Sequence, residues 1–532
     1  MSRRPNRALR LGLARQSGYS DAPAAAGIGM ANTEANDGGA NRWPKPNGLT
    51  LTAIIIAFVL VWSGYFAISE VATAIHNDMA EAYVWGREFQ LGYNQHPPFW
   101  AWLCGLWFLV FPRAGWAFGL LSTLNAAIGL LGAWALIGRF AGGATRIAAT
   151  ALLILTPFYT FLAYKYNANA IFLSLWPWTL YFFVRSIDER RLRDALLFGL
   201  LMGLALLSKY FALELAATCL IAALQHPERR RWFAGPSPYL AAAVAALAVA
   251  PHFGWLVAHG APPLHYLARI SGRGWGETAR YAAGAFFGAL AQNAVALAIV
   301  LFVARMRPHE IAASAGAHWR DARFRMLTSL TIAPLILTTL AAFVLHNKVS
   351  TNMLIGTFPL APLLAIEIVD RRGVARLATL AVKLAAALSL AALVVSPGVA
   401  LARAWLSHDQ NDVEPRKELA EAATQIWRAA TDAPLTYVSG TARYDYGVAF
   451  YSPDHPHGFI GFDFWRNQWV TPEKLTRSGL LSVCVAEDLA CLAATEALAT
   501  PAATRRDVTL AHDAFGHRGQ PMRFIVTVIP PA

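Results

Sequence analysis

Long apolar runs, separated by arginine-rich connections, constrain what this chain can fold into more than any other feature. A helix that crosses a bilayer needs about 20 mainly apolar residues, or fewer where neighbouring protein shields its ends. About eleven runs meet that requirement, at residues 49–68, 118–137, 147–163, 170–184, 195–208, 211–224, 239–257, 281–303, 326–345, 353–369 and 375–397. They predict an all-α polytopic membrane domain.

The composition agrees with this class and excludes several others. Of the 532 residues, 56% are hydrophobic and only 14% are charged, whereas soluble domains are about 25% charged. The four cysteines are too few for a disulfide-built secreted scaffold, and the apolar content excludes intrinsic disorder. The net charge of +13 does not indicate a nucleic-acid partner, because membrane proteins use excess Lys and Arg to hold their cytoplasmic loops inside.

The distribution of Lys and Arg sets the orientation of the spans and decides the role of the ambiguous apolar run 99–111. If that run crossed the membrane, the arginine-dense connections would lie outside, against the positive-inside rule. We therefore predict that it lies in the interface as a Trp-rich helix. The connections then placed inside are 139–146, 185–193, 229–231, 305–325 and 371–376. Residues 1–47, with five arginines before position 16, are predicted to be a disordered basic cytoplasmic tail, and 48–400 the transmembrane domain.

Three segments on the predicted outer face are too long to be turns: 70–117, 259–280 and 401–532. In the last of these, runs typical of strands alternate with runs typical of helices, which predicts a small C-terminal α/β domain outside the membrane. The strand-like runs are 435–439, 447–451, 480–485 and 523–529, and the helix-like runs are 415–430 and 486–498.

Two features of this predicted outer domain bear on its environment and ligands. Cys484 and Cys491 are seven positions apart, and an oxidising compartment would allow a disulfide between them. The aromatic segments 443–446 and 465–469 suit glycan binding, although ordinary aromatic packing explains them equally well.

The first outer loop carries two acids at helical spacing. Asp78 and Glu81 are three positions apart and therefore share one face of a helix, which Gly92 and the pair Pro97-Pro98 end. Two acids facing one way at the membrane surface are a candidate catalytic base. From spacing alone, solvated acids on an interfacial helix are the simpler explanation.

Cations and amides occur at three further connections on the same predicted face. Lys165, Asn167 and Asn169 lie between two spans, Lys209 lies between the next two, and Lys348 follows the span that ends at residue 345. Such groups can hold a phosphate or a sugar. The alternatives are interfacial Lys and Tyr anchors and, for Lys209, a structural ion pair with Glu214 inside the following span.

These segments resemble the protein-mannosyltransferase-like family of polytopic glycosyltransferases in the C-type superfamily, which includes bacterial lipid A aminoarabinose transferases. The resemblance covers about residues 50–370. Its carriers are AEAYVWGREFQLGY followed by HPPFWAW, then TPFYTFLAYKYNANAIFLSLWPW, LALLSKYFALEL and LHNKVSTNMLIGTFPLAPLLA. The order and spacing of these segments are more specific than any single motif.

The resemblance implies an enzyme that takes a sugar from a polyprenyl phosphate and transfers it to a lipid, glycan or protein acceptor on the periplasmic face of the bacterial inner membrane. Its partners would be that donor, the envelope acceptor and membrane lipids, with no nucleic acid. Asp78 or Glu81 would act as the base in an inverting displacement. The leaving phosphate would be stabilised by cations from a set that comprises His96, Lys165, Lys209 and Lys348.

Two departures from the family pattern affect the implied chemistry. Family members carry Asp-Glu where this chain has Ala80-Glu81, which leaves the base open between Asp78 and Glu81. The family's Asp in the second outer turn is Asn169 here, and a neutral amide is a poorer ligand for a hard cation than a carboxylate. The family leaves room for a divalent metal cofactor, but we assign no metal ligands in this chain.

Two other functions remain open. A transporter or lipid flippase would also be polytopic and basic inside, but it predicts polar residues at mid-depth in several spans, whereas the polar groups here gather at one face. A non-catalytic relative that kept the fold and lost its base would explain Ala80.

Overall fold

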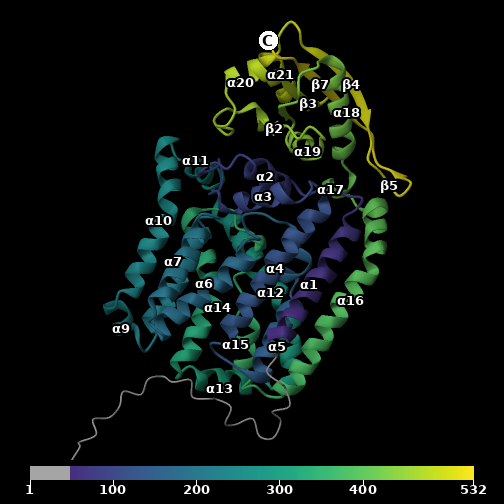
Figure 1. Ribbon diagram of the computed structural model, residues 1–532. Coiled ribbons are helices and arrows are strands. Elements are labelled where there is room, and N and C mark those ends of the chain that lie inside the picture. Colours follow the sequence, from purple (N-terminus) through teal and green to yellow (C-terminus); the bar gives the residue numbers. More distant parts are fainter. Residues whose placement is uncertain (1–47) are drawn as a thin grey trace, which may run out of the picture. The chain divides into compact units, whose positions relative to one another are not determined.

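The computed structural model describes residues 48–532, so the predicted tail at 1–47 lies outside the described residues. Residues 48–406 are helical (Figure 1). The helices are α1 (Gly48–Ser69), α2 (Asn77–Gly86), α3 (Phe99–Val110), α4 (Gly115–Ile137), α5 (Gly143–Ile154), α6 (Phe172–Asp188), α7 (Leu192–Leu206), α8 (Ala212–Gln225), α9 (Arg229–Ala234), α10 (Ser237–Ala258), α11 (Pro262–Ile270), α12 (Trp275–Ala304), α13 (Pro308–His318), α14 (Ala322–Leu345), α15 (Ala361–Ile368) and α16 (Val374–Leu406).

Six of the described helices, α1, α4, α10, α12, α14 and α16, are long and apolar enough to cross a membrane. A seventh span results if α5 is counted together with the segment Pro157–Tyr164, to which it joins at a bend of 72°. Each of the predicted runs falls on a helical segment, but several of these helices, such as α15, are short. The structure therefore shows a polytopic helical fold, and the count of eleven spans stays a prediction.

Close helix packing and apolar outer faces characterise this bundle. Neighbouring helices such as α4 and α6 approach so closely that a Cβ on Gly129 would lie 2.1 Å from the Leu173 carbonyl oxygen, as is usual where small residues line helix contacts in membranes. Side chains on the outward faces are large and apolar, for example Leu247 and Val344, which are 72% and 76% exposed. Such surface suits lipid rather than water.

Helices α2 and α3 lie across one end of the bundle, below the C-terminal sheet (Figure 1). They pack tightly, because Gly86 of α2 meets the backbone of Gly105 in α3. With 12 residues, α3 is too short to cross a bilayer. Several helices that are predicted to span, such as α8 with 14 residues, are short as well, so the placement of 99–111 in the interface stays a prediction.

Residues 407–532 form a mixed sheet with short helices. The helices are α17 (Gln410–Val413), α18 (Arg416–Ala430), α19 (Tyr444–Tyr451), α20 (Pro472–Ser478) and α21 (Leu489–Leu498). The strands are β1 (Tyr437–Gly440), β2 (His457–Gly458), β3 (Leu480–Val485), β4 (Thr504–Leu510), β5 (Asp513–Ala514), β6 (His517–Arg518) and β7 (Met522–Ile529). The main sheet has the order β2-β1-β3-β7-β4, in which β2, β1 and β3 are parallel and β7 is antiparallel to both its neighbours.

Three of the four predicted strand runs and both predicted helix runs fall on elements of the matching kind, whereas β2, β4 and α20 are not predicted. Cys484 and Cys491 form the predicted disulfide, with Cα atoms 5.7 Å apart. The run 447–451, predicted as a strand, belongs to helix α19. Its residues Gly447–Phe450 are all buried, so the 3.6-residue periodicity that identifies a helix is hidden.

Candidate functional site

The two acids of the first outer segment lie on α2, as their spacing predicts. His76 caps this helix, because its Nδ1 accepts a hydrogen bond from the Asp78 backbone N–H at 3.2 Å. Asp78 is half exposed, with 45% of its side chain accessible. Ala80, at the position where the resemblance implies an Asp, is buried.

A chain of hydrogen bonds joins Asp78 to a lysine from a distant connection. Asn167 donates from Nδ2 to Asp78 Oδ2 at 2.9 Å, and its own Oδ1 accepts the backbone N–H of Asn169 at 2.9 Å. Lys209 donates from Nζ to Asn169 Oδ1 at 2.6 Å. The structure thus brings together four residues that the sequence singles out separately.

The turn that carries these amides is held in place from both sides. After α5 the chain forms two short 3-10 turns, η2 (Pro157–Tyr159) and η3 (Phe161–Tyr164). Ser122 of α4 donates to the Tyr164 carbonyl at 2.7 Å, and the Tyr166 hydroxyl donates to the Trp100 carbonyl of α3 at 2.9 Å. These bonds direct the following amides toward α2.

The second acid, Glu81, has a raised pKa. Burial, reinforced by the negative charge of Asp78, raises the pKa of Glu81 to about 8. A hydrogen bond from Tyr446, in the C-terminal part, acts in the opposite direction and lowers that pKa. Glu81 is therefore mainly neutral at pH 7, with Asp78 as the negative charge beside it.

Burial also sets the charges of two predicted phosphate-binding residues. It lowers the pKa of Lys209 to about 8, against the opposing effect of the Asp78 charge, so the lysine is still mainly a cation at pH 7. Burial and the nearby Lys209 charge lower the pKa of His96 to about 3. The His96 ring can therefore offer a hydrogen bond but no positive charge, contrary to the predicted cationic role.

The other two predicted cations, Lys165 and Lys348, have different surroundings. Lys165 is exposed, and its charge acts on His76, the cap of α2. Lys348 lies over the ring of Tyr281, 5.3 Å from its centroid. Within residues 48–532 no hydrogen bond or ion pair connects Lys348 to Asp78 or to the amides of the second turn.

The alternative ion pair between Lys209 and Glu214 does not form. Glu214 of α8 instead accepts a hydrogen bond from the Thr338 hydroxyl of α14 at 2.6 Å, while the Lys209 ammonium is bonded to Asn169. The lysine is therefore held toward the site and not toward the interior of α8.

Sequence reasoning missed the role of single residues in the outer segments. In 443–446, Tyr444 is buried against the Phe524 ring, but Tyr446 reaches Glu81. Trp469 is buried and donates to the Gly458 carbonyl at 3.0 Å, so it is a packing residue. Nothing in the local sequence separates these tyrosines, because their partners, Phe524 and Glu81, are far away in the sequence.

The donor groups of the site do not suit a divalent cation. Asn169 Oδ1 already accepts the Lys209 ammonium, and Asn167 Oδ1 accepts two backbone N–H groups. Within residues 48–532 no group of three or more His, Cys, Asp or Glu is placed to hold a metal ion. A hard cation prefers several carboxylate or free carbonyl oxygens, and here Asp78 has beside it only Glu81, which burial keeps mainly protonated at pH 7.

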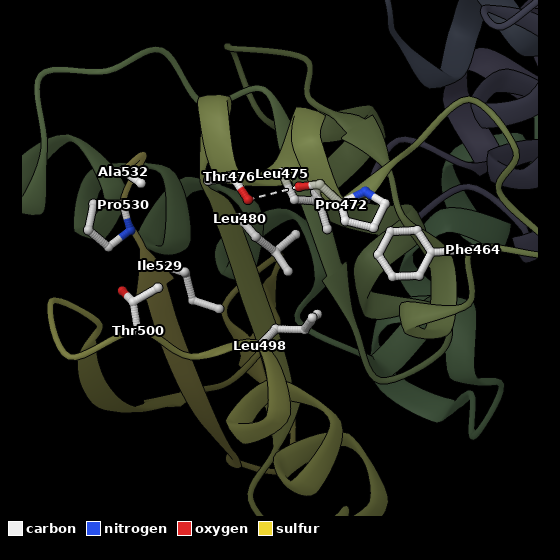
Figure 2. Close-up of a pocket in the computed structure, with 10 residues that line it drawn as sticks. All are labelled: Phe464, Pro472, Leu475, Thr476, Leu480, Leu498, Thr500, Ile529, Pro530 and Ala532. Atoms are coloured by element: carbon white, nitrogen blue, oxygen red, sulfur yellow. Dashed lines mark hydrogen bonds between the residues drawn. The ribbon is translucent and has the colours of Figure 1, made fainter.

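A separate apolar cavity of about 220 Å³ lies in the C-terminal part (Figure 2). It is lined by Phe464, Pro472, Leu475, Thr476, Leu480, Leu498, Thr500, Ile529, Pro530 and Ala532. None of these side chains titrates, and none belongs to the group around Asp78. The cavity therefore lacks the acids and bases that the site on α2 combines.

Comparisons with known proteins bear on both the fold and the site. Residues 95–255 match the dolichyl-phosphate-mannose-protein mannosyltransferase family, and no curated protein matches the sequence. The crystal structure of apo ArnT from Cupriavidus metallidurans matches with a TM-score of 0.59 at 16% identity, covering 90% of this chain and 97% of that one. ArnT from the same organism bound to undecaprenyl phosphate gives a TM-score of 0.39 at 15% identity, covering 90% and 98%.

These findings confirm the resemblance seen in the sequence. The chain has an ArnT-like fold over nine-tenths of its length and is similar to the mannosyltransferase family over 95–255. That segment contains five of the eight predicted functional residues: His96, Lys165, Asn167, Asn169 and Lys209. The two acids of α2 and Lys348 lie outside it.

Proposed function

We propose that this chain, ArnT-like in fold, transfers a glycosyl group from a polyprenyl-phosphate sugar to a lipid, glycan or protein acceptor on the periplasmic face of the bacterial inner membrane. The observation that carries the proposal is the chain Asp78, Asn167, Asn169, Lys209. It sets one carboxylate and one ammonium at the same end of a lipid-facing bundle, linked through neutral amides. A base and a cation so placed are what transfer from a phosphate ester requires.

Asp78 is the base in this proposal. As the acceptor oxygen or nitrogen attacks the anomeric carbon, Asp78 takes the acceptor proton, and the bond from that carbon to the phosphate oxygen breaks. Attack from the face opposite to the leaving group inverts the anomeric configuration. Glu81 is a poorer candidate for the base, because its raised pKa keeps it protonated at pH 7.

Lys209 stabilises the charge that grows on the departing phosphate. The ammonium is partly buried, and an electrostatic contact is stronger in such surroundings than in water. An arriving phosphate would raise the pKa of Lys209 again and keep it a cation. His96, as a neutral ring, would add a hydrogen bond to the sugar or the phosphate, and Asn167 and Asn169 would hold Asp78 and Lys209 apart.

The polyprenyl carrier is supported by the fold and by the apolar surface. ArnT has been crystallised with undecaprenyl phosphate, and the fold of apo ArnT is shared by this chain. The outward apolar faces of the bundle would place the site beside the hydrocarbon that a polyprenyl tail needs. We propose a carrier of this class as the donor here.

The proposed orientation, with the tail at 1–47 in the cytoplasm and 401–532 in the periplasm, is supported by the other end of the bundle. The arginine-rich connections gather there and contact one another: Arg139 pairs with Asp188, and the Arg323 guanidinium donates to the Arg139 carbonyl. These connections lie at the end opposite to α2 (Figure 1). The positive-inside rule places that end in the cytoplasm.

The proposal is tested with the full chain in nanodiscs and a panel of polyprenyl-phosphate sugars. We expect one donor to give turnover that is lost in Asp78→Asn and kept in Asp432→Asn, an exposed acid far along the chain. Binding of a donor without turnover, with every acceptor class supplied, would favour a non-catalytic relative. Movement of a donor across a vesicle membrane without transfer would favour a flippase.

A further inference from the structure

The segment that leads into α2 is hydrogen-bonded to the C-terminal part of the chain. The Ala74 backbone N–H donates to the Asn411 carbonyl of α17 at 2.8 Å. The Ile75 backbone N–H donates to the Tyr451 hydroxyl of α19 at 2.7 Å. Two elements that lie more than 300 positions further along the chain therefore fix the backbone just before α2.

A buried guanidinium completes these contacts. Arg416 of α18 is only 2% exposed. Its Nη1 donates to the Ile75 carbonyl at 3.2 Å and to Asn77 Oδ1 at 2.8 Å. Its Nε donates to Glu414 Oε2 at 2.9 Å, and its Nη2 lies 2.7 Å from the same oxygen and donates to Asn411 Oδ1 at 3.1 Å. Every nitrogen of the guanidinium thus has an acceptor.

The pairing with Glu414 determines how Arg416 acts on α2. The carboxylate largely cancels the field of the guanidinium, so the arginine does not serve the site as a charge. It acts through the directions of its N–H groups, which the planar guanidinium fixes relative to one another. The Ile75 carbonyl and the Asn77 side chain are therefore held in one arrangement.

This arrangement bears directly on Asp78. Asn77 is the first residue of α2, and Asp78 follows it in the same turn. The helix has 10 residues, and isolated helices of fewer than about 12 residues are marginal in water, so its first turn needs outside support. Asn167 holds the Asp78 carboxylate from the front at 2.9 Å, and Arg416 holds the backbone behind it.

We infer that Arg416 is a positioning residue of the transfer site: its hydrogen bonds to Ile75 and Asn77 hold the first turn of α2 so that Asp78 faces the reacting groups. This inference rests on the proposed function. Arg416 itself touches no reacting group. Its effect on the rate arises because a displacement of a catalytic group by about 1 Å lowers a rate by about 10²-fold.

Two substitutions weaken these bonds from opposite sides, and a third serves as the matched control. Arg416→Lys keeps a cation beside Glu414 but lacks the planar fork. Asn77→Ala removes the acceptor on α2. Arg428 lies on the same helix α18 and pairs with Asp454, within the C-terminal part. Arg428→Lys makes the same exchange there without touching α2.

The first measurement is the single-turnover rate per folded molecule of the full chain in nanodiscs. We expect Arg416→Lys and Asn77→Ala each to lower this rate by about tenfold, the effect of one lost hydrogen bond. The double variant should lose little more than either single variant, because both break the same contact. Arg428→Lys should keep the wild-type rate.

The same substitutions in an Asp78→Asn background separate positioning from a merely structural role. If Arg416 acts by placing the Asp78 carboxylate, Arg416→Lys should not lower the residual rate of Asp78→Asn any further. A structural role would lower it by the same factor as in the wild type. An equal loss in the two backgrounds would therefore overturn the inference, as would a wild-type rate in both Arg416→Lys and Asn77→Ala.

Hydrogen exchange of the backbone at 74–80 tests the contact without turnover. Exchange there should be about tenfold faster in Arg416→Lys and Asn77→Ala than in the wild type, and unchanged in Arg428→Lys. Unchanged exchange in the first two variants would overturn the inference whatever the rates. If Arg416→Lys does not fold, Asn77→Ala decides by the same criteria. Absence of wild-type turnover with every donor would instead contradict the proposed function, and the exchange data would still test the contact.

Discussion

Both ends of the helix bundle are rich in charged residues, but the charges of the candidate site have other partners than those of the arginine-rich end. At the arginine-rich end, opposite charges meet directly: Arg139 lies 3.0 Å from Asp188 and 2.8 Å from Glu189, and Arg371 lies 3.0 Å from Glu367. At the end that carries α2, Asp78 and Lys209 are each bonded to a neutral amide and not to each other.

This difference separates structural charges from available ones. The two charges of an ion pair largely cancel each other's electric field, so neither charge acts strongly on an approaching reactant. A charge whose only partner is an amide keeps its field for a reactant that enters the site. Direct ion pairs also occur beside α2, for example between Arg403 and Asp412, so the pairing pattern distinguishes Asp78 and Lys209 from the paired charges. Mutations of Asp78 and of a paired acid should therefore have opposite signatures.

The largest expected effect comes from exchanging a carboxylate for an amide at each end. Asp78→Asn should lower kcat by about 10²- to 10⁴-fold, the usual contribution of a general base, and leave the thermal midpoint nearly unchanged. Asp188→Asn should keep kcat and lose about 2 kcal/mol of stability, because Arg139 and His226 lose a charged acceptor. Single-turnover kinetics and thermal unfolding of the purified variants measure both. Similar signatures for the two variants would contradict the distinction.

The second effect concerns the cation. Lys209→Met should lower kcat by about 10²-fold, because the leaving phosphate loses a preorganised partner. Lys348→Met, at a cation that lies over Tyr281 and outside the hydrogen-bonded chain, should have a much smaller effect. A larger loss from Lys348→Met than from Lys209→Met would place the phosphate beside Tyr281 instead. Steady-state rates at saturating donor give the comparison.

The sequence predicts the local features of both ends, but it does not predict which residues far apart in the sequence contact each other. Apolar runs locate the helices, and the spacing of Asp78 and Glu81 correctly puts them on one helical face. The bonds that define the site join residues far apart: Asn167 is 89 positions from Asp78, and Lys209 is 40 from Asn169. No local periodicity encodes such contacts. Tyr446 and the neutral state of His96 depend on burial, which becomes known only with the fold.

A smaller effect should appear in the pH dependence of stability. The pKa of Glu81 is raised to about 8 in the folded protein, whereas an unfolded Glu titrates near 4.3. The folded state therefore binds the proton more tightly, and stability falls as pH rises from about 4.3 through 8. Glu81→Gln removes this loss, so its thermal midpoint should exceed that of the wild type at pH 9 and approach it at pH 5. A pH-independent difference would contradict a buried, protonated Glu81.

The smallest expected effect is that of a chelator. At the end that carries α2, the Lys209 ammonium donates a hydrogen bond to the amide oxygen of Asn169. The lysine cation therefore already uses the oxygen that an added metal would need as a ligand. Turnover in EDTA should equal turnover in Mg²⁺ or Mn²⁺. The variant Asn169→Asp sharpens this test. The new carboxylate could pair with Lys209, as in the ion pairs of the arginine-rich end, and slow transfer. Alternatively it would bind a metal and make turnover sensitive to EDTA. Loss of wild-type turnover in EDTA, restored by a divalent cation, would show that the built-in ammonium is not sufficient.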